Sequence, residues 1–250
     1  MDYLLEVKNL RVELEDRLIL EDVSFGLRSS EIHVLFGPNG SGKTSLISAI
    51  AGLPGYRIVS GRIIFMGEDI TGKSVEERAR LGIGVGFQTP PEVTGVKLVD
   101  LLKLCLGKGS EDEFSAEEIR LIEHFRLQGF LNREVNVGFS GGERKRAEIL
   151  QLLFLKPKVM LLDEPDSGVD VESLKIIAGE IQRYIESSGA SALVVTHKGD
   201  ILDYIKAKYG CVLLNGKLYC FMNPKRVYED IKREGYEGCI KCQMKGEEKW

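Results

Sequence analysis

The chain has 250 residues, of which 43% are hydrophobic and 29% are charged, and its formal net charge is −4. Its length allows one large domain, or one domain with an insertion. An acidic chain argues against nucleic acid or an anionic membrane as the main partner, because both select basic surfaces. No uncharged apolar run approaches the roughly 20 residues of a membrane span, so we expect no direct membrane insertion. The acidic N-terminus has no signal-peptide pattern, and we expect a cytoplasmic protein.

Residues 3–27 alternate between apolar and charged positions, as in Leu10, Val12 and Leu14 with charges between them. This period of two is typical of half-buried strands, and residues 15–17 have the composition of a hairpin turn. The sequence therefore predicts a small antiparallel sheet at the N-terminus. Its nearest apolar candidates for contact with a nucleotide base are Leu14 and Leu18.

A glycine-rich stretch follows, between an expected strand at residues 32–36 and an expected helix at 45–51. It matches the phosphate-loop pattern G-x-x-x-x-G-K-[ST], whose backbone amides and helix N-terminus bind phosphates. Lys43 would place its charge on the outer phosphates, and the Thr44 hydroxyl would ligate Mg²⁺. The alternative is a glycine-rich turn that binds nothing. The predicted ATP-binding residues are Gly37, Pro38, Asn39, Gly40, Ser41, Gly42, Lys43, Thr44 and Ser45.

The next stretch alternates strand and helix signals. Residues 61–67 and 82–87 read as strands, and Ser74 with Glu77 forms a capping box that predicts a short helix. Two prolines at 90 and 91 break regular structure. From residue 89 to about 150 we expect an all-helical insertion, in which Ser140 begins the last helix.

The α/β pattern resumes after the insertion. The apolar run at 159–162 predicts a strand that ends in Asp163 and Glu164. Asp163 suits a Mg²⁺ carboxylate, and Glu164 suits a general base for an attacking water. The alternative is that both acids merely cap the next segment. Helices are expected at 171–185 and 200–205, and a strand is expected at 191–196.

Gln88 and His197 also follow predicted strands. Ligands of open parallel sheets bind at the carboxyl ends of the strands, which favours functional roles for both. Gln88 could reach the metal or the attacking water, and His197 could bond a γ-phosphate oxygen. A lone histidine is otherwise more often structural. Further on, Asn215-Gly216 is a two-residue hairpin signal, and the last residues read as a solvated tail.

Five cysteines occur, at positions 105, 211, 220, 239 and 242. An odd number in a cytoplasmic chain predicts reduced thiols rather than disulfides. Cys239 and Cys242 could belong to a metal or cluster site, but they supply only half of a four-ligand set. Incidental thiols are the interpretation we favour.

Together these stretches resemble the ATP-binding-cassette ATPases, in the order of that family's motifs over about residues 4–235. The resemblance implies a P-loop α/β fold with an N-terminal antiparallel β subdomain and an inserted α-helical subdomain. It assigns residues 3–88 and 156–235 to the nucleotide-binding core, 89–155 to the helical subdomain and 236–250 to a tail. It implies ATP and Mg²⁺ as cofactors, with Thr44, Gln88 and Asp163 near the metal and Glu164, His197 and Gln88 as catalytic residues.

The resemblance also implies that two copies close head to tail around ATP. The signature residues then act on the partner's nucleotide, and they are Ser140, Gly141, Gly142 and Glu143. The corresponding D-loop residues are Asp166, Ser167, Gly168 and Asp170.

Within that family, the stretches 87–96 and 136–146 look like the SufC group, the ATPases of SUF iron–sulfur cluster assembly. That likeness implies SufB- and SufD-like scaffold partners and an ATP-dependent homodimer, with docking around residues 89–101. Pro165 is the residue typical of transporters, so the ATPase subunit of a membrane transporter remains the alternative. Three consecutive basic residues either pair with acidic side chains or form a solvent-exposed helix face, and we favour the exposed face for at least two of them. They are Arg144, Lys145 and Arg146.

Overall fold

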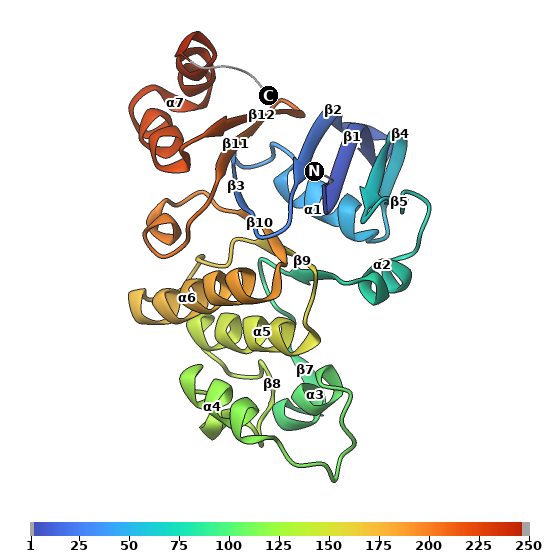
Figure 1. The fold of residues 1–250 in the computed structure, drawn as a ribbon, viewed down its shortest axis with the longest axis vertical. Coiled ribbons are helices and arrows are strands. Elements are labelled where there is room, and N and C mark those ends of the chain that lie inside the picture. Colours follow the sequence, from blue (N-terminus) through green and yellow to red (C-terminus); the bar gives the residue numbers. More distant parts are fainter. Residues whose placement is uncertain (1–2, 247–250) are drawn as a thin grey trace.

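A six-stranded sheet forms the centre of the fold, with the strand order β12–β11–β3–β10–β9–β6 (Figure 1). The computed structural model describes residues 3–246. All neighbouring strands are parallel except β12, which pairs antiparallel with β11. The strands are β3 (Ile32–Phe36), β6 (Ile83–Gly86), β9 (Val159–Asp163), β10 (Ser191–Val195), β11 (Tyr209–Leu214) and β12 (Lys217–Met222).

Alternate residues of the central strands face two separate apolar cores. In β3, Val34 and Phe36 join one core while Leu35 joins the other, and β9 and β10 behave in the same way. Strands β3, β9 and β10 are buried along their whole length, as expected where both faces of a parallel sheet are covered. One face carries α1 (Lys43–Ala51), and the other carries α5 (Gly141–Leu155) and α6 (Val171–Ser188).

The predicted N-terminal antiparallel sheet is present and has the strand order β2–β1–β4–β5 (Figure 1). Glu15 and Asp16 form the predicted turn, with φ angles of 48° and 59°. The strands are β1 (Leu5–Leu14), β2 (Arg17–Leu27), β4 (Tyr56–Phe65) and β5 (Glu68–Asp69). The predicted capping box of Ser74 and Glu77 begins α2 (Val75–Leu81).

The segment between β6 and β9 projects below the central sheet in Figure 1. The expectation that it is all helical is wrong, because Val93 pairs with Val135 in a small antiparallel ladder. The side-chain amide of Asn136 also donates to the Pro91 carbonyl oxygen at 2.7 Å, which fastens the proline turn to this ladder. Besides α5, its elements are β7 (Val93–Lys97), α3 (Leu98–Cys105), α4 (Ala116–His124), η1 (Gln128–Phe130) and β8 (Glu134–Val135).

The C-terminal part follows η2 (Asp200–Asp203) and the hairpin of β11 and β12, whose turn is at Asn215-Gly216 as predicted. Residues 224–246 then form α7 (Pro224–Gly246), two helical pieces joined by a kink at Gly235. The interpretation of 236–250 as a tail is therefore wrong for residues 236–246. Cys239 and Ile240 join the apolar core, and burying them favours an ordered helix. Residues 247–250 lie outside the described part of the chain.

Cys211 and Cys220 form a disulfide, so the expectation of reduced thiols throughout is wrong. The two residues are direct cross-strand partners in β11 and β12, and the hairpin register brings their Cα atoms to 4.0 Å. Cys105, Cys239 and Cys242 are free. Within residues 3–246, no group of three or more His, Cys, Asp or Glu side chains could hold a metal ion. None of the helices described there is both long and apolar enough to cross a membrane.

Candidate active site

The phosphate loop joins the end of β3 to the start of α1, as the sequence predicts. A Cβ atom at Gly37 would lie 2.5 Å from the Leu213 carbonyl oxygen, so only glycine fits here without a shift. Gly42 is the N-cap of α1, and its φ of 99° lies in the left-handed region that favours glycine. The loop is thus fixed between β11 and the helix whose N-terminus it carries.

Lys43 folds back over this loop. Its ammonium group donates to the carbonyl oxygens of Gly37 at 2.8 Å and Pro38 at 2.9 Å. Burial lowers the pKa of Lys43, while Glu164 and Asp163 oppose that shift. The Ser41 hydroxyl is buried and has no hydrogen-bond partner among the described residues. A buried unpaired hydroxyl and a cation beside backbone amides make this loop suitable for phosphate.

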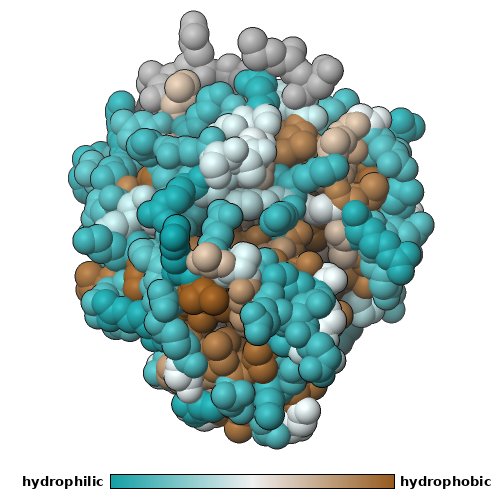
Figure 2. All heavy atoms as spheres, turned by 60° about the horizontal axis from the view of Figure 1, so that its bottom comes forward, coloured by the Kyte–Doolittle hydropathy of each residue, from teal (hydrophilic) through white to brown (hydrophobic). Residues whose placement is uncertain are grey.

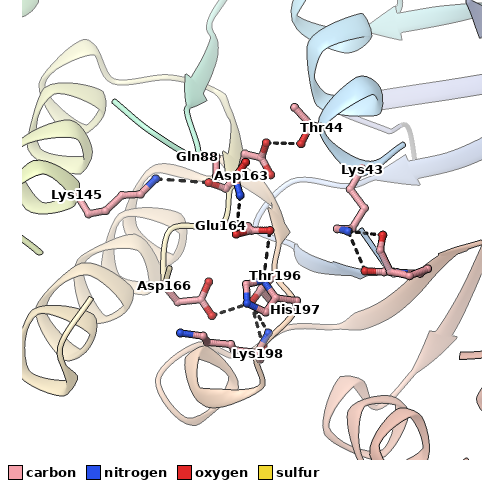
Figure 3. Close-up of polar contacts among 12 residues, drawn as sticks. Lys43, Thr44, Gln88, Lys145, Asp163, Glu164, Asp166, Thr196, His197 and Lys198 are labelled. Carbon is pink, nitrogen blue, oxygen red and sulfur yellow. Dashed lines mark hydrogen bonds and ion pairs between the residues drawn. The ribbon is translucent and has the colours of Figure 1, made fainter. Parts of the chain in front are cut away.

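The Thr44 hydroxyl and the Asp163 carboxylate meet across the site. Thr44 Oγ1 donates to Asp163 Oδ2 at 2.7 Å (Figure 3). Asp163 is buried, and burial raises its pKa while the Thr44 hydrogen bond lowers it. Oxygen ligands such as these suit Mg²⁺, which takes one or two protein ligands and completes its shell with phosphates and water. The pair therefore fits the predicted metal position.

Glu164 lies at the centre of the predicted catalytic residues. Its Oε2 accepts from the Gln88 amide nitrogen at 2.9 Å, and its Oε1 lies 3.2 Å from Nδ1 of His197 (Figure 3). The backbone of Glu164 has a φ of 48°, an uncommon value for a residue other than glycine. The structure thus brings Gln88, Glu164 and His197 together from three strand ends.

The D-loop is tied to the same strand ends. The Thr196 hydroxyl donates to Asp166 Oδ2 at 2.6 Å and accepts from the Lys198 amide at 2.9 Å. Burial raises the pKa of Asp166, and the Thr196 hydrogen bond opposes that shift. Asp170 is the N-cap of α6, where it accepts from the Ser173 amide and hydroxyl. Of the other predicted residues, Ser167 is half-buried and Gly168 is exposed.

The signature residues lie at the N-terminus of α5, where Ser140 and Glu143 form a capping box. Ser140 and Gly141 are exposed, and a Cβ atom at Gly141 would lie 2.6 Å from the carbonyl oxygen of Gly168 in the D-loop. The hydrogen bonds of Ser140 and Glu143 are made to each other, across the capping box. The structure therefore does not bring the signature residues to the phosphate loop of the same chain.

A hollow of about 310 Å³ adjoins the phosphate loop. Leu18, which is 43% exposed, is among its lining residues, and Leu14 is not. Their contact with a base stays a prediction. None of the described residues that line it is aromatic, so a base bound there would meet aliphatic and polar groups. The lining residues are Leu18, Ile19, Glu21, Pro38, Asn39, Gly40, Ser41, Asn215 and Gly216.

The sequence does not predict the burial of two charged residues of α5, Lys145 and Glu148. Lys145 bonds the backbone oxygen of Phe87, and Glu148 accepts from the backbone nitrogen of Phe87 at 2.6 Å. The expectation that most of the basic residues here solvate a helix face is wrong. Lys145 is buried, and Arg144 pairs with Glu92 at 2.9 Å. Nothing in the spacing of these residues along the sequence indicates contacts to a loop some 60 positions earlier.

The chain is similar to known proteins over most of its length. The sequence model of the ABC transporter family matches residues 20–167. A probable ATP-dependent transporter, ycf16, of Trieres chinensis is 38% identical over 246 residues, covering 94% of this chain and 96% of that protein. A probable ABC transporter ATP-binding protein of Streptococcus pyogenes is 36% identical over 243 residues, covering 94% of each.

Solved structures share the fold. The chain is similar to a nucleotide-free ATP-binding cassette from an ABC transporter, with a TM-score of 0.77, 24% identity, and coverage of 95% and 98%. It is also similar to an ATP-binding subunit of an ABC transporter, with a TM-score of 0.76, 26% identity, and coverage of 97% and 96%. The family match spans the phosphate loop through to the D-loop. The chain therefore belongs to the ABC transporter family and carries its nucleotide-binding ATPase fold.

Proposed function

We propose that this chain binds and hydrolyses ATP to drive conformational change in a SufB/SufD-type scaffold that assembles iron–sulfur clusters. The observation that carries the ATPase part is the position of Glu164 between Gln88 and His197, beside the Thr44–Asp163 pair. The assembly part rests on the likeness of residues 87–96 and 136–146 to the SufC group.

Glu164 is suited to act on the attacking water. The Gln88 amide and the His197 ring hold its two carboxylate oxygens, which fixes its direction. A carboxylate held in this way can accept the proton that the water loses as it attacks the terminal phosphate. Lys43 and the loop amides bind the phosphate oxygens and stabilise their charge.

Thr44 and Asp163 would hold the magnesium ion. When bound, Mg²⁺ neutralises charge on the phosphates and helps to fix their geometry. The Thr44 hydroxyl and the Asp163 carboxylate lie 2.7 Å apart, so both oxygen donors are available at one place in the site. Contact of Gln88 with the metal stays a prediction, since its amide nitrogen is directed to Glu164.

The functional unit we propose is a head-to-tail dimer. Ser140 and Gly141 are exposed at the N-terminus of a 15-residue helix, away from the phosphate loop of their own chain. A helix N-terminus with an exposed hydroxyl is suited to bind phosphate. A second copy would bring these groups to the first copy's nucleotide, so that ATP favours the closed pair.

The partner surface is expected beside the loop that holds Gln88. Phe87, Val93 and Val96 are 43%, 36% and 36% exposed, which makes an apolar surface next to the site. Figure 2 shows that apolar side chains also gather between polar ones on the side of the molecule that lies at the bottom of Figure 1. Since Glu92 is paired with Arg144, a partner that docks here could also act on the signature helix.

A second candidate function is the ATPase subunit of a membrane transporter. The names of the relatives, a probable ATP-dependent transporter and a probable ABC transporter ATP-binding protein, favour it. In that case the same apolar surface would bind a membrane subunit, and the chemistry at Glu164 would be unchanged.

Binding to purified partners tests the two functions. The Glu164→Gln variant, with ATP, is mixed with SufB- and SufD-type scaffold proteins and the mass of the complex is measured by light scattering. We expect a stable complex that ADP weakens, and we expect Val96→Glu to abolish it. Failure to bind either scaffold, together with binding to a detergent-solubilised transporter subunit, would refute the assembly role.

A further inference from the structure

We propose that Glu148 is a positioning residue that fastens the loop carrying Gln88 to the signature helix α5. Through this attachment, movement of α5 would set the position of Gln88 against Glu164. The inference rests on the proposed ATPase cycle and adds a residue that the cycle would need.

Glu148 and Lys145 hold both backbone groups of Phe87, the residue before Gln88. Glu148 Oε1 accepts from the Phe87 amide at 2.6 Å, and the Lys145 ammonium donates to the Phe87 carbonyl oxygen. The two side chains also lie 3.4 Å apart, and Lys145 Nζ lies 3.5 Å from the Asp163 carbonyl oxygen. Figure 3 shows Lys145 directed from its helix toward the backbone beside Gln88.

The packing of α5 on β6 explains why Glu148 can reach this loop. A Cβ atom at Gly86 would lie 3.7 Å from the Glu148 carboxyl carbon and 3.0 Å from Leu162. The Glu148 carboxyl group thus lies at ordinary van der Waals distance from the end of β6, while the close contact at Gly86 is with the neighbouring strand β9. Burial raises the pKa of Glu148, whereas the neighbouring Lys145 opposes that shift.

A buried ion pair of this kind is costly to form and is weak grounds for stability alone. Its contacts, however, join three parts of the site. Residues 145 and 148 share a helix with the signature residue Ser140. Eight residues of helix span about 12 Å, and a rigid secondary element can carry coupling between two sites. A partner that moves Ser140 would thus move Phe87, and with it the Gln88 amide that holds Glu164.

A purely structural role is the competing explanation, and Glu180 provides the control. Glu180 is 4% exposed and Glu148 is 7% exposed, and both are ion-paired on helices of the same face. Glu180 pairs with His124 and Arg183, which lie outside the site described above. Truncation of either glutamate should therefore cost comparable stability, but only Glu148 should affect the active site.

The experiment compares Glu148→Ala, Glu148→Gln and Glu180→Ala in the full chain, together with the scaffold partner if hydrolysis requires it. We expect kcat for ATP to fall about tenfold in Glu148→Ala, with the Kd for a fluorescent ATP analogue within about twofold of wild type. Glu148→Gln keeps an acceptor for the Phe87 amide and should recover most of kcat. Glu180→Ala should keep kcat within about twofold.

Amide hydrogen exchange provides a readout that does not depend on hydrolysis. The peptide containing Phe87 should exchange faster in Glu148→Ala and at the wild-type rate in Glu180→Ala. Equal kcat in Glu148→Ala and Glu180→Ala, or no change in exchange at Phe87, would overturn the inference. An inactive wild-type chain would instead contradict the proposed ATPase function, and the exchange result would still decide the role of Glu148.

Discussion

Arg78 anchors the C-terminal end of the helix that begins at the phosphate loop. Its guanidinium donates to the carbonyl oxygens of Ala49 at 2.7 Å and Ile50 at 2.8 Å, both at the end of α1. It also donates to the carbonyl oxygens of Thr71 at 2.7 Å and Lys73 at 3.0 Å. Arg78 is only 2% exposed, so these groups meet in a site that water barely reaches.

We predict that Arg78→Met destabilises the fold by about 3 kcal/mol. The Ala49 carbonyl oxygen keeps a bond from the Gly52 amide, so the loss falls on the buried Ile50 carbonyl and on the half-buried carbonyls of Thr71 and Lys73. A buried carbonyl without a partner costs about 1–3 kcal/mol, and the helix end also loses a favourable cation worth about 0.3–1 kcal/mol. The folded variant no longer bears the desolvation penalty of a buried charge, which offsets part of the loss in stability. For a chain of this size, the estimate corresponds to a fall in the thermal midpoint of about 6–12 °C.

Urea unfolding of the wild type and three variants tests whether the Arg78 contacts stabilise the fold. Arg80→Met removes the same charge from an exposed position on the same helix, and its free energy of unfolding should stay within about 0.5 kcal/mol of wild type. Arg78→Lys should lie between wild type and Arg78→Met, because lysine keeps the charge but loses the planar fork. If Arg78→Met were no less stable than Arg80→Met, the guanidinium contacts would not contribute to stability.

Other predictions follow from the same structure. Lys43→Ala and Ser140→Arg should each abolish ATP hydrolysis, and their mixture should restore it, because a head-to-tail pair rebuilds one intact site; no recovery would contradict the proposed dimer. Replacing Cys211 and Cys220 by serine should lower the free energy of unfolding by about 2–3 kcal/mol, through the larger entropy of the unfolded chain; an unchanged urea midpoint would refute this. Burial lowers the pKa of His33 from 6.5 to about 4, so its neutral form is favoured in the folded state. The stability that this provides is present above pH 6.5 and is lost as the pH falls toward 4, and His33→Gln should flatten that part of the unfolding profile.

Much of the site could be predicted because its residues stand at strand ends. A glycine loop between a strand and a helix indicates a phosphate site from local spacing alone. Gln88, Glu164 and His197 each follow an apolar strand, and parallel strands bring such positions to one edge. In the structure these three side chains lie in contact with one another.

Contacts that depend on packing between distant segments could not be predicted. Glu148 lies inside a helix, and nothing in its neighbourhood in the sequence shows that β6 packs against this face. The small β7–β8 ladder could not be predicted either, because strands this short show too little periodicity in the sequence.

The odd number of cysteines led to a prediction of reduced thiols, although the sequence contains a pattern that indicates the Cys211–Cys220 disulfide. The predicted turn at Asn215-Gly216 already sets the hairpin register, in which Cys211 lies opposite Cys220. A prediction of reduced thiols that rests on the expected cellular compartment takes no account of this cross-strand position. Similarly, the polar composition around Cys239 and Ile240 suggests a tail, although both residues are buried in the core.

Hydrolysis by the Glu164→Gln variant decides whether Glu164 acts as the base. The substituted amide would keep the size of the side chain but could no longer accept a proton from water. With Mg²⁺, we expect that the wild-type chain releases phosphate from ATP, while Glu164→Gln binds ATP with wild-type affinity and releases almost none. A variant that hydrolyses ATP at the wild-type rate would show that Glu164 is not the base, and the proposed mechanism would be wrong.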